Sequence, residues 1–228
     1  MSPRVLPAGP EAVAEVLRAL DRGGLVILPH ATNYNVVCDA DHPEAVEAVF
    51  RAKRRVKLGP LPVCLPDVAS VDRYVEVPGW FPREALEALW PGEVCFVFRQ
   101  RHPFPSRLTC GLGTVAVTVT SAPFYAAVTR AAGRPLASSS ANLSGTATGR
   151  VTLARALSDL GDCVDLAVDA GDDPAEAPAC GNTIVDLTFD RPRLVRAGAV
   201  PTETIRVYLP TLDDDSVAYQ SLLAARAA

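Results

Sequence analysis

Hydroxyl-bearing side chains gather in one short stretch of the chain. Residues 138–145 contain four serines, one asparagine and one glycine, and they carry no charge. Each of these polar side chains needs a hydrogen-bond partner, so we expect a loop at the end of a strand rather than part of the core. Such a loop can present donors to an anion or a polar ligand. The same residues also suit a serine-rich turn followed by a helix N-cap.

A second candidate group consists of cations. Lys53, Arg54, Arg55 and Lys57 follow an amphipathic segment over 43–53 and give this acidic chain its densest positive charge. Arginine binds a phosphate through two parallel hydrogen bonds, and lysine binds it as a point charge. A solvated helix C-terminus is the alternative, because the helix dipole favours cations there.

A third candidate is the polar segment that follows the apolar run 25–28. A polar loop at a strand end can hold a small polar substrate, and a histidine there can act as a base or orient the substrate near neutral pH. A simple turn held by asparagine and threonine is the alternative. The candidate substrate-binding residues of this loop are Pro29, His30, Thr32 and Tyr34.

Composition limits the partners that this chain can have. It has 228 residues and a formal net charge of −4, which argues against a broad nucleic-acid surface, so RNA is not expected as a direct ligand. No apolar run approaches the ~20 residues of a membrane span, and no signal-peptide core is visible, so a cytoplasmic location without membrane contact is expected. The six cysteines form no CxxC pair, and the three histidines are far apart. We therefore expect buried free thiols and no metal site.

The elements that must position these residues alternate irregularly along the chain. We expect an α/β (α+β mixed) fold, in which a mixed sheet carries helices on its faces. One domain is expected over 1–209, followed by a C-terminal tail over 210–228. The expected helices are 10–22, 43–53, 82–90, 122–132 and 151–160, and the expected strands are 25–28, 60–65, 94–98, 114–120 and 164–168, with a hairpin of 183–187 and 193–196.

Five segments in a fixed order resemble the Sua5/YrdC/YciO family. The resemblance covers about residues 8–200, nearly the whole chain, and it implies a twisted open sheet with a large concave, positively lined cavity. The segments that carry it are 24–34, the Lys-Arg-Arg at 53–55 with Pro-Leu at 60–61, Trp-Pro-Gly at 90–92, Ser-Ser-Ala-Asn-Leu-Ser-Gly at 139–145, and 183–187 with 194–199.

The resemblance also implies a reaction and a set of residues. The implied enzyme is an ATP-dependent nucleotidyltransferase that makes a carbamoyl-adenylate of the threonylcarbamoyl-AMP type from ATP, bicarbonate and an amino acid. Mg²⁺ would accompany the triphosphate. Lys53, Arg55 and His30 are the candidate catalytic residues, acting through positioning and charge. The residues implied to hold the nucleotide are Lys53, Arg55, Ser140, Asn142, Ser144 and Arg196.

The departures from the family pattern concentrate on the amino-acid side. Thr118 stands where the family has an arginine that helps to hold the substrate carboxylate, and His30, Ala31, Asn35 and Cys95 also differ from the pattern. Losing such a charge-assisted contact costs about 1.5–3 kcal/mol, on the order of a hundredfold in affinity at the upper end. A compensating cation could come from His30 or Lys57.

We therefore expect a retained nucleotide site beside an altered acceptor site that also involves Thr118. Three functions stay open: a threonylcarbamoyl-AMP synthase, a carbamoyl-adenylate-handling transferase of a specialised pathway with another acceptor, and a non-catalytic nucleotide- or RNA-binding homologue. All of them require that Lys53 and Asn142 lie close together beside one hollow. The sequence predicts neither the acceptor nor the oligomeric state.

Overall fold

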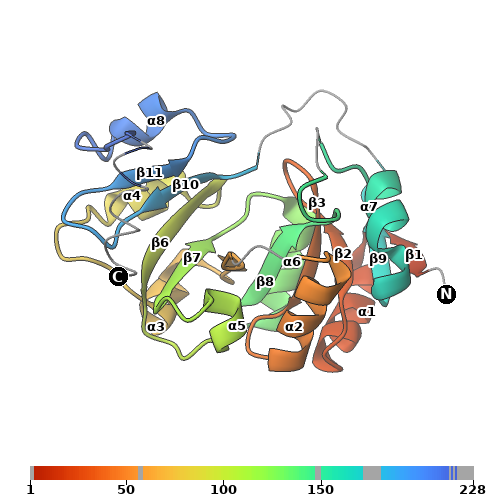
Figure 1. The fold of residues 1–228 in the computed structure, drawn as a ribbon. Helices are drawn as coiled ribbons and strands as arrows, with labels where there is room; N and C mark the ends of the chain where they lie inside the picture. Colours follow the sequence, from red (N-terminus) through yellow and green to blue (C-terminus); the bar gives the residue numbers. More distant parts are fainter. Residues whose placement is uncertain are drawn as a thin grey trace.

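The computed structural model describes residues 3–55, 59–146, 150–171 and 181–215, together with Val217 and Tyr219. Within these ranges the strands form one 11-stranded mixed sheet in the order β1-β9-β2-β3-β8-β4-β7-β6-β10-β11, with β5 paired to β6 (Figure 1). The strands are β1 (Arg4–Pro7), β2 (Val26–Pro29), β3 (Tyr34–Asp39), β4 (Val63–Cys64), β5 (Val75–Glu76), β6 (Val94–Gln100), β7 (Thr114–Thr118), β8 (Leu136–Ser140), β9 (Leu166–Asp169), β10 (Thr183–Asp186) and β11 (Arg193–Arg196).

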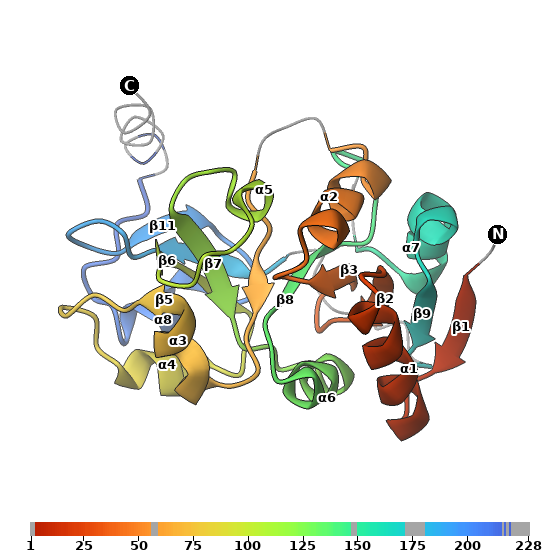
Figure 2. The same ribbon diagram turned by 90° about the horizontal axis from the view of Figure 1, so that it is seen from below.

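Helices cover both faces of the sheet. Seen from below, α1 and α6 lie on one side of the β2–β3–β8 region, and α2, α5 and α7 lie on the other side (Figure 2). The helices are α1 (Pro10–Asp21), α2 (Pro43–Ala52), α3 (Val71–Tyr74), α4 (Glu84–Leu89), α5 (Ser106–Thr109), α6 (Pro123–Ala132), α7 (Leu153–Leu160) and α8 (Thr202–Arg206), with 3₁₀ turns η1 (Val68–Ser70) and η2 (Gly161–Cys163).

The continuous apolar runs of the central strands have a direct physical reason. Alternate side chains of a strand point to opposite faces, and here both faces are covered. Val26 and Leu28 of β2 join the core cluster under α1 and α6. Ile27 joins the larger cluster on the other face, together with Val36 of β3. The sheet therefore supports two apolar layers and holds its strand ends at fixed positions.

The expected mixed open sheet with helices on its faces is confirmed, but two boundaries are corrected. Ser138–Ser140 were expected in a loop, yet they complete β8, where Ser140 pairs with Asn35 of β3. The polar loop expected over 29–35 is shorter, because Pro29 ends β2 and Tyr34 begins β3. Backbone pairing causes both corrections, because it satisfies the polar main chain. Pairing with β3 allows serine side chains to stand on β8, and pairing of Pro29 with Tyr34 extends the β2–β3 ladder into the expected loop.

The last described residues pack against the β10–β11 hairpin. Asp213 forms an isolated bridge with Arg193, accepts a hydrogen bond from its Nη1 at 2.7 Å, and contacts Arg191 at 2.9 Å. Tyr219 donates its hydroxyl hydrogen to Asp186 at 3.1 Å. The start of the segment expected as a tail is thus attached to the sheet edge. Among the described helices, none has both the length and the apolar character to cross a membrane.

Candidate active site

A cavity of about 600 Å³ is lined by residues of the strands from β3 to β10 and of the loops beside them. Its size suits a small-molecule ligand, for which pockets of roughly 300–1,000 Å³ are usual. The lining residues come from strand ends and loops far apart in the sequence. They are His30, Thr32, Asn33, Asn35, Arg55, Pro60, Pro62, Cys64, Cys95, Thr118, Tyr125, Ser138, Ser139, Ser140, Val151, Gly181, Asn182, Ile184 and Arg196.

Strand register brings these residues into rows. Cys64 of β4 stands opposite Thr118 of β7, and Cys95 of β6 stands opposite Ile184 of β10. Each side chain of such a pair points to the same face of the sheet. The pairing therefore carries four cavity residues from four separate segments to one floor.

Arg55 reaches the cavity because of the way in which α2 ends. Arg54 adopts a left-handed conformation (φ 48°), and the amide of Arg55 returns to donate to the carbonyl of Phe50 at 3.0 Å. A Cβ at Gly59 would lie 2.6 Å from the Arg55 guanidinium, so any larger residue there would require this guanidinium to shift. Burial lowers the pKa of Arg55, and Arg107 acts in the same direction. Within the described ranges Arg55 forms no ion pair, so its charge is available to a ligand.

Arg196 supplies the second cation of the lining. Its Nε and Nη2 donate to the backbone carbonyl of Asn182 at 3.2 and 2.8 Å. Its guanidinium lies against Gly181, where a Cβ would come within 2.8 Å. The carbonyl of Asn182 thus fixes the direction of a guanidinium that keeps further donors for a ligand. We define Arg55, Arg196 and the nearby Ser139 and Ser140 as the cationic end of the cavity.

Lys53 lies behind the cationic end rather than in the lining. Its side chain is buried, and its ammonium group donates to the carbonyls of Ser140 and, at 2.7 Å, Asn142. Its pKa is lowered to about 8, mainly by burial and also by the neighbouring charge of Arg55, while Asp159 opposes the shift. The group therefore remains largely protonated at neutral pH. The structure places Lys53 and Asn142 together beside one cavity, with the lysine fixing the backbone of the serine-rich segment.

The end of the serine-rich segment also lies outside the lining. Asn142 is buried, its Nδ2 donates to the carbonyl of Leu143 at 2.7 Å, and its Oδ1 has no partner among the described residues. Ser144 is exposed, and its amide donates to the carbonyl of Lys53 at 2.9 Å. These contacts tie the segment to the end of α2. Of the three serine-loop candidates, Ser140 alone lines the cavity.

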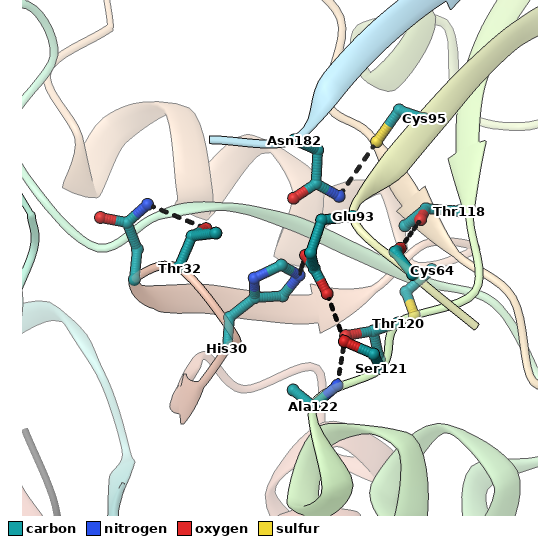
Figure 3. A network of polar contacts seen from close by, with 12 residues as sticks. His30, Thr32, Cys64, Glu93, Cys95, Thr118, Thr120, Ser121, Ala122 and Asn182 are labelled. Carbon is teal, nitrogen blue, oxygen red and sulfur yellow. Dashed lines mark hydrogen bonds and ion pairs between the residues drawn. The ribbon is translucent and has the colours of Figure 1, made fainter. Parts of the chain in front are cut away.

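A second part of the cavity is built around a histidine and a glutamate. His30 Nε2 lies 3.4 Å from Glu93 Oε2, and these side chains are only 6% and 11% exposed (Figure 3). Glu93 Oε1 accepts a hydrogen bond from Ser121 at 2.7 Å. Burial lowers the pKa of His30, and the charge of Glu93 opposes that shift. We call His30, Glu93 and the adjacent Tyr125 the histidine end.

Uncharged groups complete the histidine end. Thr118 donates its hydroxyl hydrogen to the carbonyl of Val94 at 2.8 Å, so this hydroxyl is already used. Burial raises the pKa of the Cys64 thiol to about 12 and that of Cys95 to about 11, which keeps both thiols protonated. Asn182 donates to Cys95 Sγ at 3.4 Å. In the part of the cavity wall that the structure describes, no cation stands at the position of Thr118.

The remaining candidates of the polar loop have different surroundings. Thr32 lines the cavity and accepts a hydrogen bond from Asn33 at 3.2 Å. Tyr34 is buried, and its hydroxyl accepts from the amide of Ala170 at 3.2 Å. Pro29 ends β2 outside the lining. Lys57, which was considered as a compensating cation, lies outside the described residues.

Glu93 and Tyr125 are functional candidates that the sequence reasoning missed. Glu93 follows the Trp-Pro-Gly segment directly, and Tyr125 lies on α6 among apolar neighbours. The available signal for Glu93 was a single acid before the wholly apolar start of β6. No group of three or more potential metal ligands occurs among the residues that the structure describes.

Comparison with known proteins identifies the same family that the sequence pattern resembles. A family model named Sua5/YciO/YrdC and described as "Telomere recombination" matches residues 18–198. A putative threonylcarbamoyl-AMP synthase of Mycobacterium tuberculosis is 36% identical over 193 residues, which cover 85% of this chain and 87% of the relative. The threonylcarbamoyl-AMP synthase of Rattus norvegicus is 32% identical over 201 residues, covering 86% and 70%.

A solved structure agrees at the level of the fold. The crystal structure of P. abyssi Sua5 complexed with L-threonine superimposes with a TM-score of 0.82 at 24% identity, and it covers 92% of this chain and 62% of that chain. This chain therefore spans less than two thirds of that protein. The matched range, the two relatives and the shared fold agree, and the chain belongs to the Sua5/YciO/YrdC family.

Proposed function

We propose that this protein is an adenylate-forming enzyme that converts ATP, bicarbonate and an amine-bearing acceptor into a carbamoyl-adenylate and pyrophosphate. Mg²⁺ would enter with the triphosphate as part of the substrate. One observation carries the proposal: Arg55 and Arg196 face the same cavity from opposite segments, and no carboxylate occurs in the described lining. Two guanidinium groups with no carboxylate beside them in the described lining favour a ligand with several negative charges.

The relatives support the same reaction class. Both curated relatives described above are named threonylcarbamoyl-AMP synthases. In the proposed reaction the acceptor amine adds to carbon dioxide derived from bicarbonate and loses a proton, which gives a carbamate. A carbamate oxygen then forms a bond to the α-phosphorus while the bond to pyrophosphate breaks. Arg55 and Arg196 stabilise the charge that develops on the phosphates, which is catalysis by positioning and electrostatics.

The acceptor is the part of the proposal that departs from the relatives' name. The hydroxyl of Thr118 donates to the backbone carbonyl of Val94. Thr118 therefore does not take over the role of a cation that binds the acceptor carboxylate. His30 is held neutral by burial and lines the cavity, so it is a candidate base for the proton that the amine releases. We therefore propose an acceptor that differs from threonine.

Pyrophosphate release and mass spectrometry test the proposed function. Purified protein is incubated with Mg-ATP, with or without bicarbonate, and with a panel of amino acids, amino alcohols and simple amines. We expect pyrophosphate release that requires ATP, bicarbonate and an acceptor, together with a product whose mass equals AMP joined to the carbamoylated acceptor. Pyrophosphate release that is independent of bicarbonate, or failure to bind ATP by calorimetry, would contradict the proposal.

A further inference from the structure

The histidine end contains polar atoms that the protein itself leaves unpaired. Among the described residues, His30 Nδ1 and the hydroxyl of Tyr125 are buried without a hydrogen-bond partner, while Glu93 Oε2 is contacted by His30 Nε2 at 3.4 Å. Burying a polar group without a partner is costly, so two such atoms in one cavity wall indicate that a ligand completes them. His30 and Tyr125 line the cavity, and their rings meet edge to face at 6.0 Å.

Glu93 decides which nitrogen of His30 carries the proton. A neutral imidazole has one donor nitrogen and one acceptor nitrogen. Nε2 faces Glu93 Oε2 at 3.4 Å, and a carboxylate can only accept, so the proton belongs on Nε2. Ser121 holds the other carboxylate oxygen, which fixes the direction of Glu93. Nδ1 therefore carries a lone pair, and it points away from Glu93 on the side of Thr32 (Figure 3).

These protonation states restrict what can bind there. A lone pair on His30 Nδ1 requires a donor from the ligand. A ligand carboxylate offers acceptors only, and it would also meet the negative charge of Glu93 one layer behind the imidazole. Amino and hydroxyl groups can donate to His30 and still pair with the Tyr125 hydroxyl, which both donates and accepts.

The distribution of charge around the cavity also disfavours a ligand carboxylate at the histidine end. The cations of the described lining, Arg55 and Arg196, lie at the cationic end, and Arg196 is directed by the carbonyl of Asn182. The thiols of Cys64 and Cys95 are kept protonated by burial. A carboxylate bound at the histidine end would find no positive partner in the described wall.

We propose that the histidine end binds the acceptor through an amino or hydroxyl group and excludes a free carboxylate, and that Glu93 is the positioning residue that holds His30 as a hydrogen-bond acceptor. This inference rests on the proposed function and defines the acceptor class of the same cavity. An amino alcohol or an amine, rather than a free amino acid, is the predicted substrate type.

The experiment compares L-threoninol with L-threonine, two probes that differ by a hydroxymethyl group in place of the carboxylate. Binding of each to the Mg-ATP-loaded protein is measured by calorimetry, and the affinity for ATP is measured first in the same samples. We expect L-threoninol to bind more tightly by on the order of tenfold or more, because the carboxylate of L-threonine would meet the negative charge of Glu93 behind the imidazole. Tighter binding of L-threonine, or no binding of either probe, would overturn the inference. If ATP itself fails to bind, the proposed function fails instead.

The variant Glu93→Gln tests the positioning role. The glutamine amide can donate to Nε2, which moves the imidazole proton to Nδ1 and makes it a donor toward the cavity. The preference for L-threoninol should then fall by on the order of tenfold. The matched control is Glu87→Gln on the exposed face of α4, which removes the same charge and should keep the preference. An unchanged preference in Glu93→Gln would contradict the role.

A measurement on the unmodified protein covers the case in which Glu93→Gln does not fold. Nitrogen-15 NMR of the histidine side chains distinguishes the two neutral tautomers. We expect His30 to carry its proton on Nε2, with Nδ1 unprotonated. A proton on Nδ1 would overturn the inference without any variant.

Discussion

The two ends of the cavity differ in how their charged groups are satisfied. At the cationic end, Arg55 and Arg196 are unopposed by any acid in the described lining. At the histidine end, the carboxylate of Glu93 is shared between His30 and Ser121. In the described lining, one end therefore lacks negative charge, and the other presents an unpaired acceptor, His30 Nδ1, to the cavity. A single cavity can therefore bind two chemically different substrates, a polyanion at one end and an acceptor with hydrogen-bond donors at the other.

Removing both arginines of the cationic end should have the largest effect. Arg55→Ala combined with Arg196→Ala deletes two charge-assisted contacts, each worth about 1.5–3 kcal/mol, so the affinity for Mg-ATP should fall at least about a hundredfold. Calorimetry measures this loss. The matched control is Arg51→Ala with Arg130→Ala, which removes equal charge from exposed helix positions. Equal losses in both variants would mean that net charge alone attracts the nucleotide.

Replacing Lys53 separates support of the cationic end from contact with the ligand. Lys53→Met leaves the carbonyls of Ser140 and Asn142 without their donor. An unsatisfied buried acceptor costs about 1–3 kcal/mol, and the recovered cost of burying an ammonium offsets part of the total, so the free energy of unfolding should fall by about 1–3 kcal/mol.

Urea denaturation measures the effect of Lys53→Met, with Arg51→Met as the exposed control, which should stay within about 0.5 kcal/mol of the unmodified protein. If Lys53→Met keeps full stability but loses ATP binding, Lys53 contacts the nucleotide directly. That result would add Lys53 to the residues of the cationic end.

The histidine end should make stability depend on pH. Burial holds the pKa of His30 below its ordinary value of 6.5, so below that pH the unfolded chain binds a proton that the folded chain resists. The free energy of unfolding should therefore fall as pH drops below about 6.5, by at most about 1.4 kcal/mol per pH unit for this one group.

The comparison of His30→Asn with the unmodified protein isolates that contribution. Urea denaturation between pH 5 and pH 8 should show a shallower loss of stability in His30→Asn. The control His42→Asn changes a partly exposed histidine whose ring caps α2, and asparagine also caps helices well. If the free energy of unfolding of His30→Asn depends on pH in the same way as that of the unmodified protein, His30 is not a buried group that resists protonation.

The cationic end was largely predictable from the sequence, and the histidine end was not. Lys53, Arg55 and the serine-rich segment stand in short local patterns, and the structure brings them to one cavity wall. The pairing of His30 with Glu93 depends on how the ends of β2 and β6 approach each other across the sheet, and no local pattern contains that information. The role of Lys53 also needed the structure, since a buried and an exposed lysine look alike in sequence.

The fold shows the same division between local and long-range information. Helices such as α1 and α2 were predicted to within one or two residues, because their apolar spacing is regular and a proline marks each start. The strand β1 was missed, because its four residues are largely exposed at a sheet edge and gain their structure by pairing with β9. Ser138–Ser140 were misplaced in a loop because strand pairing overrode their low strand propensity.

The most direct test of the account is a crystal structure of the protein with Mg-ATP and L-threoninol. We predict that the phosphates lie within hydrogen-bond distance of the guanidinium groups of Arg55 and Arg196, and that L-threoninol donates to His30 Nδ1 at the other end. Phosphates bound beside His30 and Glu93, or outside the cavity, would contradict the assignment of opposite roles to the two ends.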